Sequence, residues 1–468
     1  MSNSQSYVAM DQHHLIALRL GFSTRQASIV KQLGLSDYII GQLNATVSVP
    51  EPIFLTDAPK NIKEFRAFRK EMANEADEQA LAKEIIKKNL EWKVYLLKRC
   101  FETTTPLREK INLFFQNHFV TTLKGVKMPY WTYTYYKTIN QYALGNYKTL
   151  VKEMVYSNAM IMYLDNHQNR KGETNENLAR ELLELFTLGE GNYSESDIKN
   201  TALALIGLTF GEEKGMYRPM LKDNSIKTFL GVSGNFTIDD VIDLIFEQPT
   251  TAYFITEKVL KWFFDDNPSP QKIKRYGDYL KQQKFELKPF FQYLFENECE
   301  ADKGGTQLKN PMVFLFQVHH DLNLEPNYRL MVFWLKNQGM DIFDQPNVKG
   351  WKGGKDWLTA QIYADRNQMI DFIISGNSIY AERLSKRLEK LDIGKLSFRP
   401  RLALEHLMSA KTILEELTDR MVFATNEDMW TELHQLLKYD FDVKAENASK
   451  NILNVYQYLA KTPEFQLI

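Results

Sequence analysis

Several features that mark specialised classes of protein are missing or scarce in this sequence. Lysine and arginine number 58 against 59 aspartates and glutamates, a formal net charge of −1, so the basic excess typical of nucleic-acid binding is absent. The two cysteines, Cys100 and Cys299, lie far apart in amphipathic contexts and are expected to be small buried thiols, which fits a reducing compartment. No stretch reaches the roughly 18 apolar residues of a membrane span.

The beginning of the chain has no targeting signal that we can identify. The segment MSNSQSYVAMDQHHLIALRLGF contains no basic region followed by a long apolar run, which a secretory signal peptide would need. Together with the scarcity of cysteine, this pattern predicts a cytoplasmic protein.

Signatures of known chemistry are missing as well. The chain has no G-x-S-x-G elbow, no H-E-x-x-H, no EF-hand loop, no paired cysteines and no glycine-rich phosphate loop after a strand, so no nucleophile, metal site or cofactor can be assigned from a motif. We therefore expect no cofactor.

What the sequence does contain is helical periodicity over most of its 468 residues, of which 44% are hydrophobic. The segment Phe65–Phe101 has no proline or glycine and predicts one long helix or a helix pair. Strand patterns are scarce, with a short β-hairpin expected near residues 216–230. We predict an all-α, multi-helix globular bundle forming one large domain over residues 1–468, with possible subdomain joints near residues 266–270 and 302–305.

The most informative segment begins at residue 163 and ends at residue 210. Within it, residues 175–188 predict a helix, which Thr174 or Asn175 can cap at the start and Gly189 can end in a left-handed conformation. Two adjacent apolar rows make its apolar stripe wider than a surface helix needs, so we expect this helix to lie near the centre of the core. The rows consist of Leu178, Leu182 and Leu185, and of Ala179, Leu183 and Phe186.

The narrow polar face of this helix carries Glu176, Arg180, Glu181 and Glu184. One interpretation is a solvated stripe of helical ion pairs. The other is a polar seam beside a pocket, where burial and the arginine charge would move carboxylate pKa values in opposite directions. In the second case the catalytic candidates are Glu176, Glu181 and Glu184 as acid–base residues, with Arg180 and His118 as helpers. We expect Arg180 to be buried and paired with Glu176 or Glu184.

The remaining candidates are isolated side chains. His118 follows an aromatic run and is either a core residue or a general base. Asp165 and His167 are weak candidates for metal ligands, although aspartate is also common in turns. A ligand is expected near the loop of residues 165–174 and the first turn of the next helix. The binding candidates there are Asp165, Asn175 and Asn177, because a helix N-terminus suits an anion. Two more, Trp351 and Trp357, belong to a glycine-rich loop that could stack on a sugar or cover a cleft.

Several blocks of the sequence resemble one bacterial family, the domain of unknown function 1800. The segment NENLARELLELFTLGEGNYSESDIKNTALALIGLTF resembles its hallmark, HHLIALRLGFS its N-terminal helix and turn, and PLREKINLFFQNHF its next block. KTFLG, PTTAYFITEKVLKWFF and DQPNVKGWKGGKDWL resemble its later blocks. This chain departs from the family pattern in three places. The family has Trp in the block before its His, where this chain has Phe114, Phe115 and Gln116. Lys222-Asp223 replaces the usual His-Asp, and Ile206-Gly207-Leu208 replaces the usual Thr-Gly-Trp.

This resemblance implies no activity, because the family has no established one. Relatives often accompany a protein of the domain of unknown function 1501 family, so the resemblance implies such a partner. Two hypotheses follow. The first is a helical binding or assembly protein that works with a partner protein, and the alternative is a hydrolase that uses carboxylates of the helix Asn175–Glu184.

Overall fold

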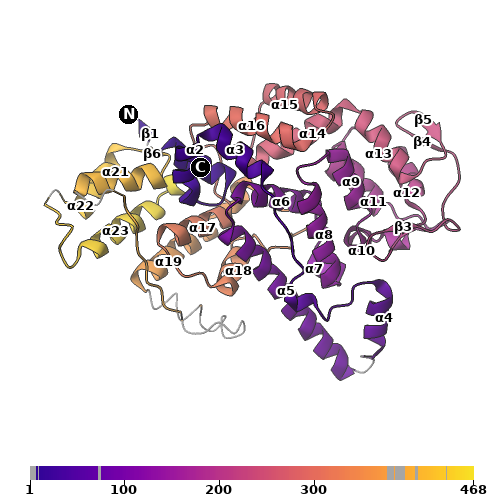
Figure 1. The fold of residues 1–468 in the computed structure, drawn as a ribbon, viewed down its shortest axis with the longest axis horizontal. Coiled ribbons are helices and arrows are strands. Elements are labelled where there is room, and N and C mark those ends of the chain that lie inside the picture. Colours follow the sequence, from indigo (N-terminus) through magenta and orange to yellow (C-terminus); the bar gives the residue numbers. More distant parts are fainter. Residues whose placement is uncertain are drawn as a thin grey trace.

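The computed structural model describes residues 7–468 except 9, 72–74, 377–383, 385–395, 406–408 and 439. The described chain is mostly helical and its elements form an elongated body (Figure 1). The all-α prediction is therefore confirmed. None of the described helices combines the length and apolar character needed to cross a bilayer.

The first part of the chain is almost entirely helical. Its helices are α1 (Gln12–Leu20), α2 (Ala27–Leu33), α3 (Leu35–Asn44), α4 (Ile62–Glu71), α5 (Glu75–Glu102), α6 (Pro106–His118), α7 (Leu123–Val126), α8 (Pro129–Tyr142), α9 (Tyr147–Val155), α10 (Asn158–Tyr163), α11 (Asn177–Glu181) and α12 (Glu195–Leu205). The predicted long helix or helix pair is a pair, α4 and α5, which together project from the body in Figure 1.

The second part continues in the same way. Its helices are α13 (Ile238–Glu247), α14 (Pro249–Phe263), α15 (Pro270–Gln282), α16 (Leu287–Ala301), α17 (Pro311–Asp321), α18 (Tyr328–Asn337), α19 (Ala360–Ser375), α21 (Ala410–Met421), α22 (Glu427–Leu436) and α23 (Ala448–Ala460). The expected subdomain joints lie in the connection before α15 and in the connection after α16.

Strands are short and occur as antiparallel pairs. In the described chain, β2 (Leu208–Thr209) pairs with β3 (Met216–Tyr217), and β4 (Lys227–Phe229) pairs with β5 (Val232–Gly234). These two pairs lie in and beside the region predicted to hold a hairpin. A third pair, β1 (Tyr7–Val8) with β6 (Ala424–Thr425), joins distant parts of the sequence.

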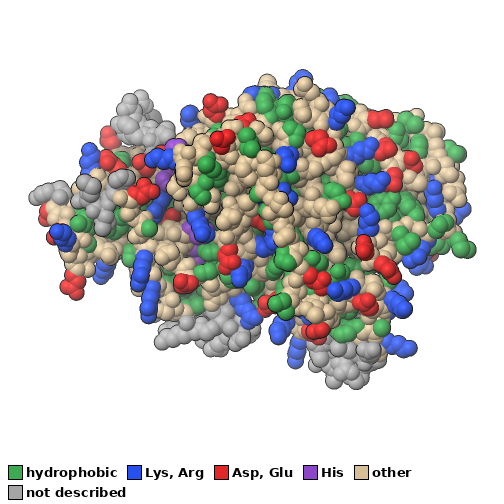
Figure 2. Space-filling view, in the orientation of Figure 1, with side chains coloured by type: hydrophobic (Ala, Val, Ile, Leu, Met, Phe, Trp, Pro, Cys, Tyr) green, Lys and Arg blue, Asp and Glu red, His purple; other side chains and the backbone are tan. Residues whose placement is uncertain are grey.

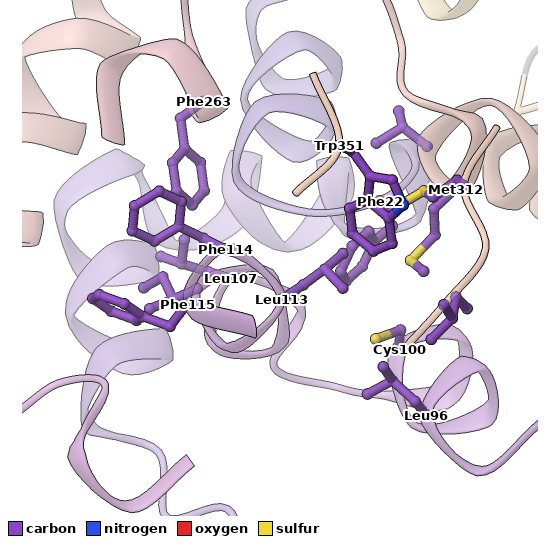
Figure 3. Close-up of a cluster of buried hydrophobic side chains, with 14 of the residues drawn as sticks. Phe22, Leu96, Cys100, Leu107, Leu113, Phe114, Phe115, Phe263, Met312 and Trp351 are labelled. Carbon is purple, nitrogen blue, oxygen red and sulfur yellow. The ribbon is translucent and has the colours of Figure 1, made fainter. Parts of the chain in front are cut away.

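A hydrophobic cluster runs through the described chain and holds the helices together. Figure 3 shows part of it, where Phe114 on α6 faces Phe263 on α14 with ring centroids 6.5 Å apart. Trp351, from the loop after α18, belongs to the same cluster. Cys100 and Cys299 are both buried and unpaired, as expected. Helix α6, which also packs against α1, α3, α5 and α8, therefore contacts two segments that come much later in the sequence, α14 and the loop containing Trp351.

Candidate functional site

The helix predicted over residues 175–188 is central, but it is not a regular α-helix. It begins as α11 and continues as a π-helix over Leu182–Thr187. The amide of Leu188 donates to the carbonyl of Leu183, five residues earlier, over 2.9 Å, and the Thr187 hydroxyl donates to the Leu182 carbonyl. The members of both apolar rows are buried, which confirms the predicted position in the core. A π-turn of this kind is frequent at functional sites.

The end of the helix follows the prediction, because Gly189 has φ +82°. The start differs, because α11 begins at Asn177 and its N-cap residue is Glu176, which makes no capping bond with its side chain. The Asn175 side chain instead accepts a hydrogen bond from the amide of Asn177 over 2.9 Å in the turn before the helix. A Cβ atom at Gly189 would lie 2.8 Å from the Phe254 ring of α14. The glycine therefore both ends the helix and lets α14 approach it closely.

The polar face of α11 is a solvated surface. The Arg180 side chain is 37% exposed and pairs with Glu176 at 3.3 Å and with Glu195 at 3.0 Å. The predicted pairing with Glu176 is confirmed, but the prediction that Arg180 is buried is wrong. The helix turns Arg180 toward the first turn of α12, where Glu195 is exposed, so the guanidinium keeps its contact with water.

The other two carboxylates of this face lie closer to the interior. Burial, with Glu184 nearby, raises the pKa of Glu181 above its ordinary value. Glu184 accepts hydrogen bonds from the Lys349 ammonium and the Tyr193 hydroxyl, each over 3.2 Å. Glu184 therefore connects the π-helix to the loop that contains Trp351.

The loop of residues 165–174 is held by turn and packing contacts. Asp165 has φ +56°, and the His167 ring stacks on Phe210 at 5.0 Å. In the described part of the chain no three metal-ligating side chains come together. Asn177 is exposed, and the amide of Asn175 donates to the Asn169 side chain over 3.1 Å. The structure accounts for these side chains as parts of a capped, folded loop.

His118 is a buried, neutral histidine. It is 8% exposed, and its Nε2 lies 2.9 Å from the Tyr147 hydroxyl and 3.3 Å from the Phe186 carbonyl. Burial, and secondarily the charge of Lys258, lowers its pKa to about 3. Because the imidazole is uncharged near neutral pH, it acts here as a packing group that anchors the π-helix to α6.

A cleft of about 560 Å³ opens beside His118. Its walls are α6, α14, Leu185 of the π-helix and the loop of residues 348–357, and the lining is completed by Asp266, Asn267, Gln307, Leu308, Asn310 and Ile468. Two predicted binding residues, Trp351 and Trp357, line it together with His118. Glu176, Arg180, Glu181, Glu184, Asp165, Asn175 and Asn177 are not among the residues that line it.

The cleft is strongly basic. Among the described residues that line it, Asp266 supplies the single side-chain carboxyl, and burial raises its pKa. The lining lysines are Lys110, Lys258, Lys261, Lys349, Lys352 and Lys355. The fold thus concentrates positive charge here although the chain as a whole is neutral, which creates an electrostatic preference for anions.

These lysines differ in how far their charge is already compensated. Lys349, Lys352 and Lys261 lie 3.2 Å, 3.7 Å and 2.5 Å from carboxylates outside the lining. Lys258 forms no ion pair with any described carboxylate, and its ammonium lies 5.2 Å from the Phe254 ring. Burial, then Lys261, lowers its pKa. Lys258 is therefore a cation with no described carboxylate within ion-pair distance, although the charge of Glu257 partly offsets the effect of burial.

Lys110, at the floor of the cleft, has a structural role. Its ammonium donates to the carbonyls of Leu18, Arg19 and Gly21 over 2.8–3.0 Å, and burial lowers its pKa to about 7. Carbonyls at the C-terminus of a helix attract a cation. Lys110 therefore holds the end of α1 in place.

The loop containing the tryptophans is fixed by backbone contacts. Gly350 has φ +82°, and a Cβ atom there would lie 2.4 Å from the Asn117 side chain, which accepts from the amide of Trp351 over 2.8 Å. Trp351 and Trp357 are only 5% and 6% exposed, and their ring centroids are 6.4 Å apart. They therefore form a packed wall rather than an open stacking surface.

Sequence reasoning missed the contribution of α14. Lys258, Lys261 and Trp262 all line the cleft, and Trp262 is more exposed than the two tryptophans of the loop. The signal was present in the segment KVLKWFF, where two lysines and a tryptophan recur at i, i+3 and i+4. That spacing places them on one helix face.

The fold and the cleft define a large, mostly helical protein with a basic, tryptophan-walled hollow. The sequence profile of the family described as "Protein of unknown function (DUF1800)" matches residues 14–467. The chain belongs to this family. No curated protein and no solved structure matches the chain.

Proposed function

We propose that this protein is a binding protein whose basic cleft holds an anionic ligand. The observation that carries the proposal is the presence of six lysines and one side-chain carboxyl around a hollow of about 560 Å³, among the described residues. A cleft lined by one sign of charge focuses the field and raises the local concentration of an oppositely charged ligand. The volume lies within the range of about 300–1,000 Å³ that is usual for small-molecule sites.

Binding is favoured over hydrolysis by the chemistry available in the cleft. A hydrolase would need an acid and a base within reach of the bound ligand. His118 is neutral, with hydrogen bonds to Tyr147 and Phe186, and Asp266 is the only side-chain carboxyl in the described lining. The raised pKa of Glu181 is the observation that favours the hydrolase alternative, but Glu181 is not part of the lining.

A protein partner and a cytoplasmic location complete the proposal. Large apolar side chains are unusually exposed between β3 and β5, where Met220 is 98% and Ile226 71% exposed. Figure 2 shows apolar side chains at this end of the molecule. Exposed apolar groups of this kind suit a protein contact, and the partner implied by the family resemblance is a protein of the domain of unknown function 1501 family. The free thiols Cys100 and Cys299 support a reducing compartment.

Inorganic phosphate is the simplest probe of the cleft. We expect it to raise the melting temperature of the protein when ionic strength is held constant, because a ligand that binds only the folded state stabilises it. The variant Lys258→Met should lose this rise. Lys274→Met, which removes an exposed lysine on α15 outside the cleft, is the matched control and should keep it. Equal rises in all three proteins, or none in the parent protein, would contradict the proposal.

The hydrolase alternative has a separate test. Glu181→Gln and Glu184→Gln keep the shape of the side chains but remove the carboxylates. A phosphatase or glycosidase activity on chromogenic esters and glycosides that these variants abolish would favour the enzyme. Under our proposal the parent protein shows no such turnover, and both variants still bind phosphate.

A further inference from the structure

We propose that the ligand of the cleft is an anionic sugar whose ring lies against Trp262 while its charged group meets Lys258. This inference rests on the proposed function and adds the chemical class of the ligand. It follows from how α14 presents two side chains to the cleft, and from the amide groups around them.

Lys258 and Trp262 are four residues apart on α14, and both line the cleft. Residues at i and i+4 lie on the same helix face, about 6 Å apart along the axis. One side chain offers a positive charge that lacks a carboxylate partner in the described chain, and the other offers an aromatic surface. A ligand that used both would therefore carry an anionic group about one helical turn from a flat apolar face.

Trp262 is suited to contact a ring. It is partly exposed, unlike Trp351 and Trp357, and its ring contacts Phe114, another lining residue, at a centroid distance of 6.0 Å. The indole nitrogens of Trp262 and Trp351 have no acceptor among the described residues. A buried donor without an acceptor is costly, so an oxygen from water or from a ligand is expected there.

Side-chain amides favour a hydroxylated ring over an aromatic one. Asn117, Asn267 and Asn310 line the cleft. The Asn310 oxygen accepts from the amides of Met312 and Val313, and the Asn117 oxygen accepts from the amide of Trp351. Because these oxygens are engaged, the NH₂ groups are what the two side chains can offer a ligand, and they suit the oxygen atoms of a sugar.

Calorimetric titration with four probes tests this inference at constant ionic strength. The probes are inorganic phosphate, glucose 6-phosphate, glucuronate and phenyl phosphate. We expect glucose 6-phosphate to bind about tenfold tighter than either inorganic phosphate or phenyl phosphate, a difference of about 1.4 kcal/mol. The position of glucuronate in this ranking distinguishes a phosphate from a carboxylate as the preferred charged group.

The outcomes separate the two proposals. Equal affinity for inorganic phosphate and glucose 6-phosphate would overturn the sugar but leave the anion-binding proposal standing. Phenyl phosphate binding as tightly as glucose 6-phosphate would also overturn the sugar, in favour of an aromatic anion. If none of the four probes binds, both proposals fail.

Two variants assign the roles within the cleft. Trp262→Leu should lower the affinity for glucose 6-phosphate by about tenfold more than the affinity for inorganic phosphate, whereas Lys258→Met should weaken both by about tenfold. The matched controls are Trp430→Leu, a partly buried tryptophan on α22, and Lys274→Met, both outside the cleft. A sugar advantage that survives in folded Trp262→Leu overturns the inference.

A spectroscopic measurement does not depend on the stability of the leucine variant. In protein labelled with nitrogen-15 in its indole groups, Trp262→Phe identifies the Trp262 signal. We expect glucose 6-phosphate to shift this signal much more than inorganic phosphate does. Equal shifts with both probes would contradict a ring placed at Trp262.

Discussion

The polar face of α11 and the basic cleft beside α14 are two charged regions joined by the same π-helix, and they differ in how charge is arranged. On α11, Arg180 is shared between Glu176 and Glu195 at the surface, so the charge of the arginine is fully compensated. In the cleft, lysines from three segments, α6, α14 and the loop after α18, share a lining that holds a single side-chain carboxyl among the described residues. A dense run of polar residues in sequence can therefore mark a surface whose cation is already paired, whereas a site with an unpaired cation is assembled from residues far apart along the chain.

The largest expected change in stability comes from Leu182→Ala, which tests whether the π-helix lies in the core between the two regions. Leu182 is fully buried, so Leu182→Ala should lower the free energy of unfolding by about 2–5 kcal/mol through lost apolar contacts and the cavity left behind. Denaturant titration measures this change. Leu221→Ala, at an exposed position, is the control and should change stability by less than about 0.5 kcal/mol. A loss below about 1 kcal/mol for Leu182→Ala would mean that the helix is peripheral.

The pH dependence of stability tests the environment of His118, which lies beside the cleft. The folded-state pKa of His118 is lowered to about 3 against about 6.5 in an unfolded chain. The unfolded state therefore binds the proton first, and the stability contributed above pH 6.5 is lost as the pH falls toward 3. Between pH 6.5 and 5 this loss is about 2 kcal/mol for a single group.

His118→Gln removes the titrating group and should make the loss of stability between pH 7 and pH 5 smaller by about 2 kcal/mol. Unfolding by denaturant at the two pH values gives the difference. An unchanged slope in His118→Gln would show that the pKa of His118 is not lowered in the folded state.

A smaller effect is expected where the π-helix meets α14. Gly189→Ala places a Cβ atom 2.8 Å from the Phe254 ring at a residue with φ +82°, so we expect a loss of about 1–2 kcal/mol from strain and crowding. Gly172→Ala also has a positive φ, +89°, but meets nothing within 4 Å. The difference between the melting temperatures of the two variants measures the cost of crowding against Phe254. Equal losses in both variants would show that this contact costs nothing and that only the positive φ matters.

The smallest effect belongs to the surface of α11. Arg180→Met breaks two ion pairs of an arginine that is 37% exposed, and pairs of this kind contribute about 0–1 kcal/mol each. We expect a change in unfolding free energy below about 1 kcal/mol that shrinks further at high salt. A loss of unfolding free energy well above that value would contradict the view that the polar face of α11 is a solvated surface.

The regular parts of the fold were predictable because their signals are local. The apolar rows Leu178–Leu182–Leu185 and Ala179–Leu183–Phe186 and the end at Gly189 all follow from helix periodicity and backbone preferences within a few residues. The pair α4–α5 follows in the same way. The burial of Arg180 was predicted wrongly because periodicity identifies the polar face of a helix but not the element, here α12, that lies beside it.

The cleft could not be predicted because it is not local. Lys110, Lys258 and Lys352 are separated by about a hundred residues or more in sequence, and each occurs in an ordinary helix or loop pattern. Their convergence depends on how α6, α14 and the loop after α18 pack. Trp351 and Trp357 were singled out by their glycine-rich context, but their burial depends on the same packing, and a sequence window does not report it.

The π-helix has a consequence for chain length. One of its turns closes over five residues where an α-helix uses four, so the segment Leu182–Thr187 contains one residue more than regular closure requires. Deleting one residue from this turn would allow it to close as a regular α-helix, and the segments before and after it would keep their orientation relative to each other. The same loss within α12 would rotate everything beyond it by about 100°. Deletions are therefore tolerated unequally along the hallmark segment, and alignments of this family should place their gaps at the π-turn.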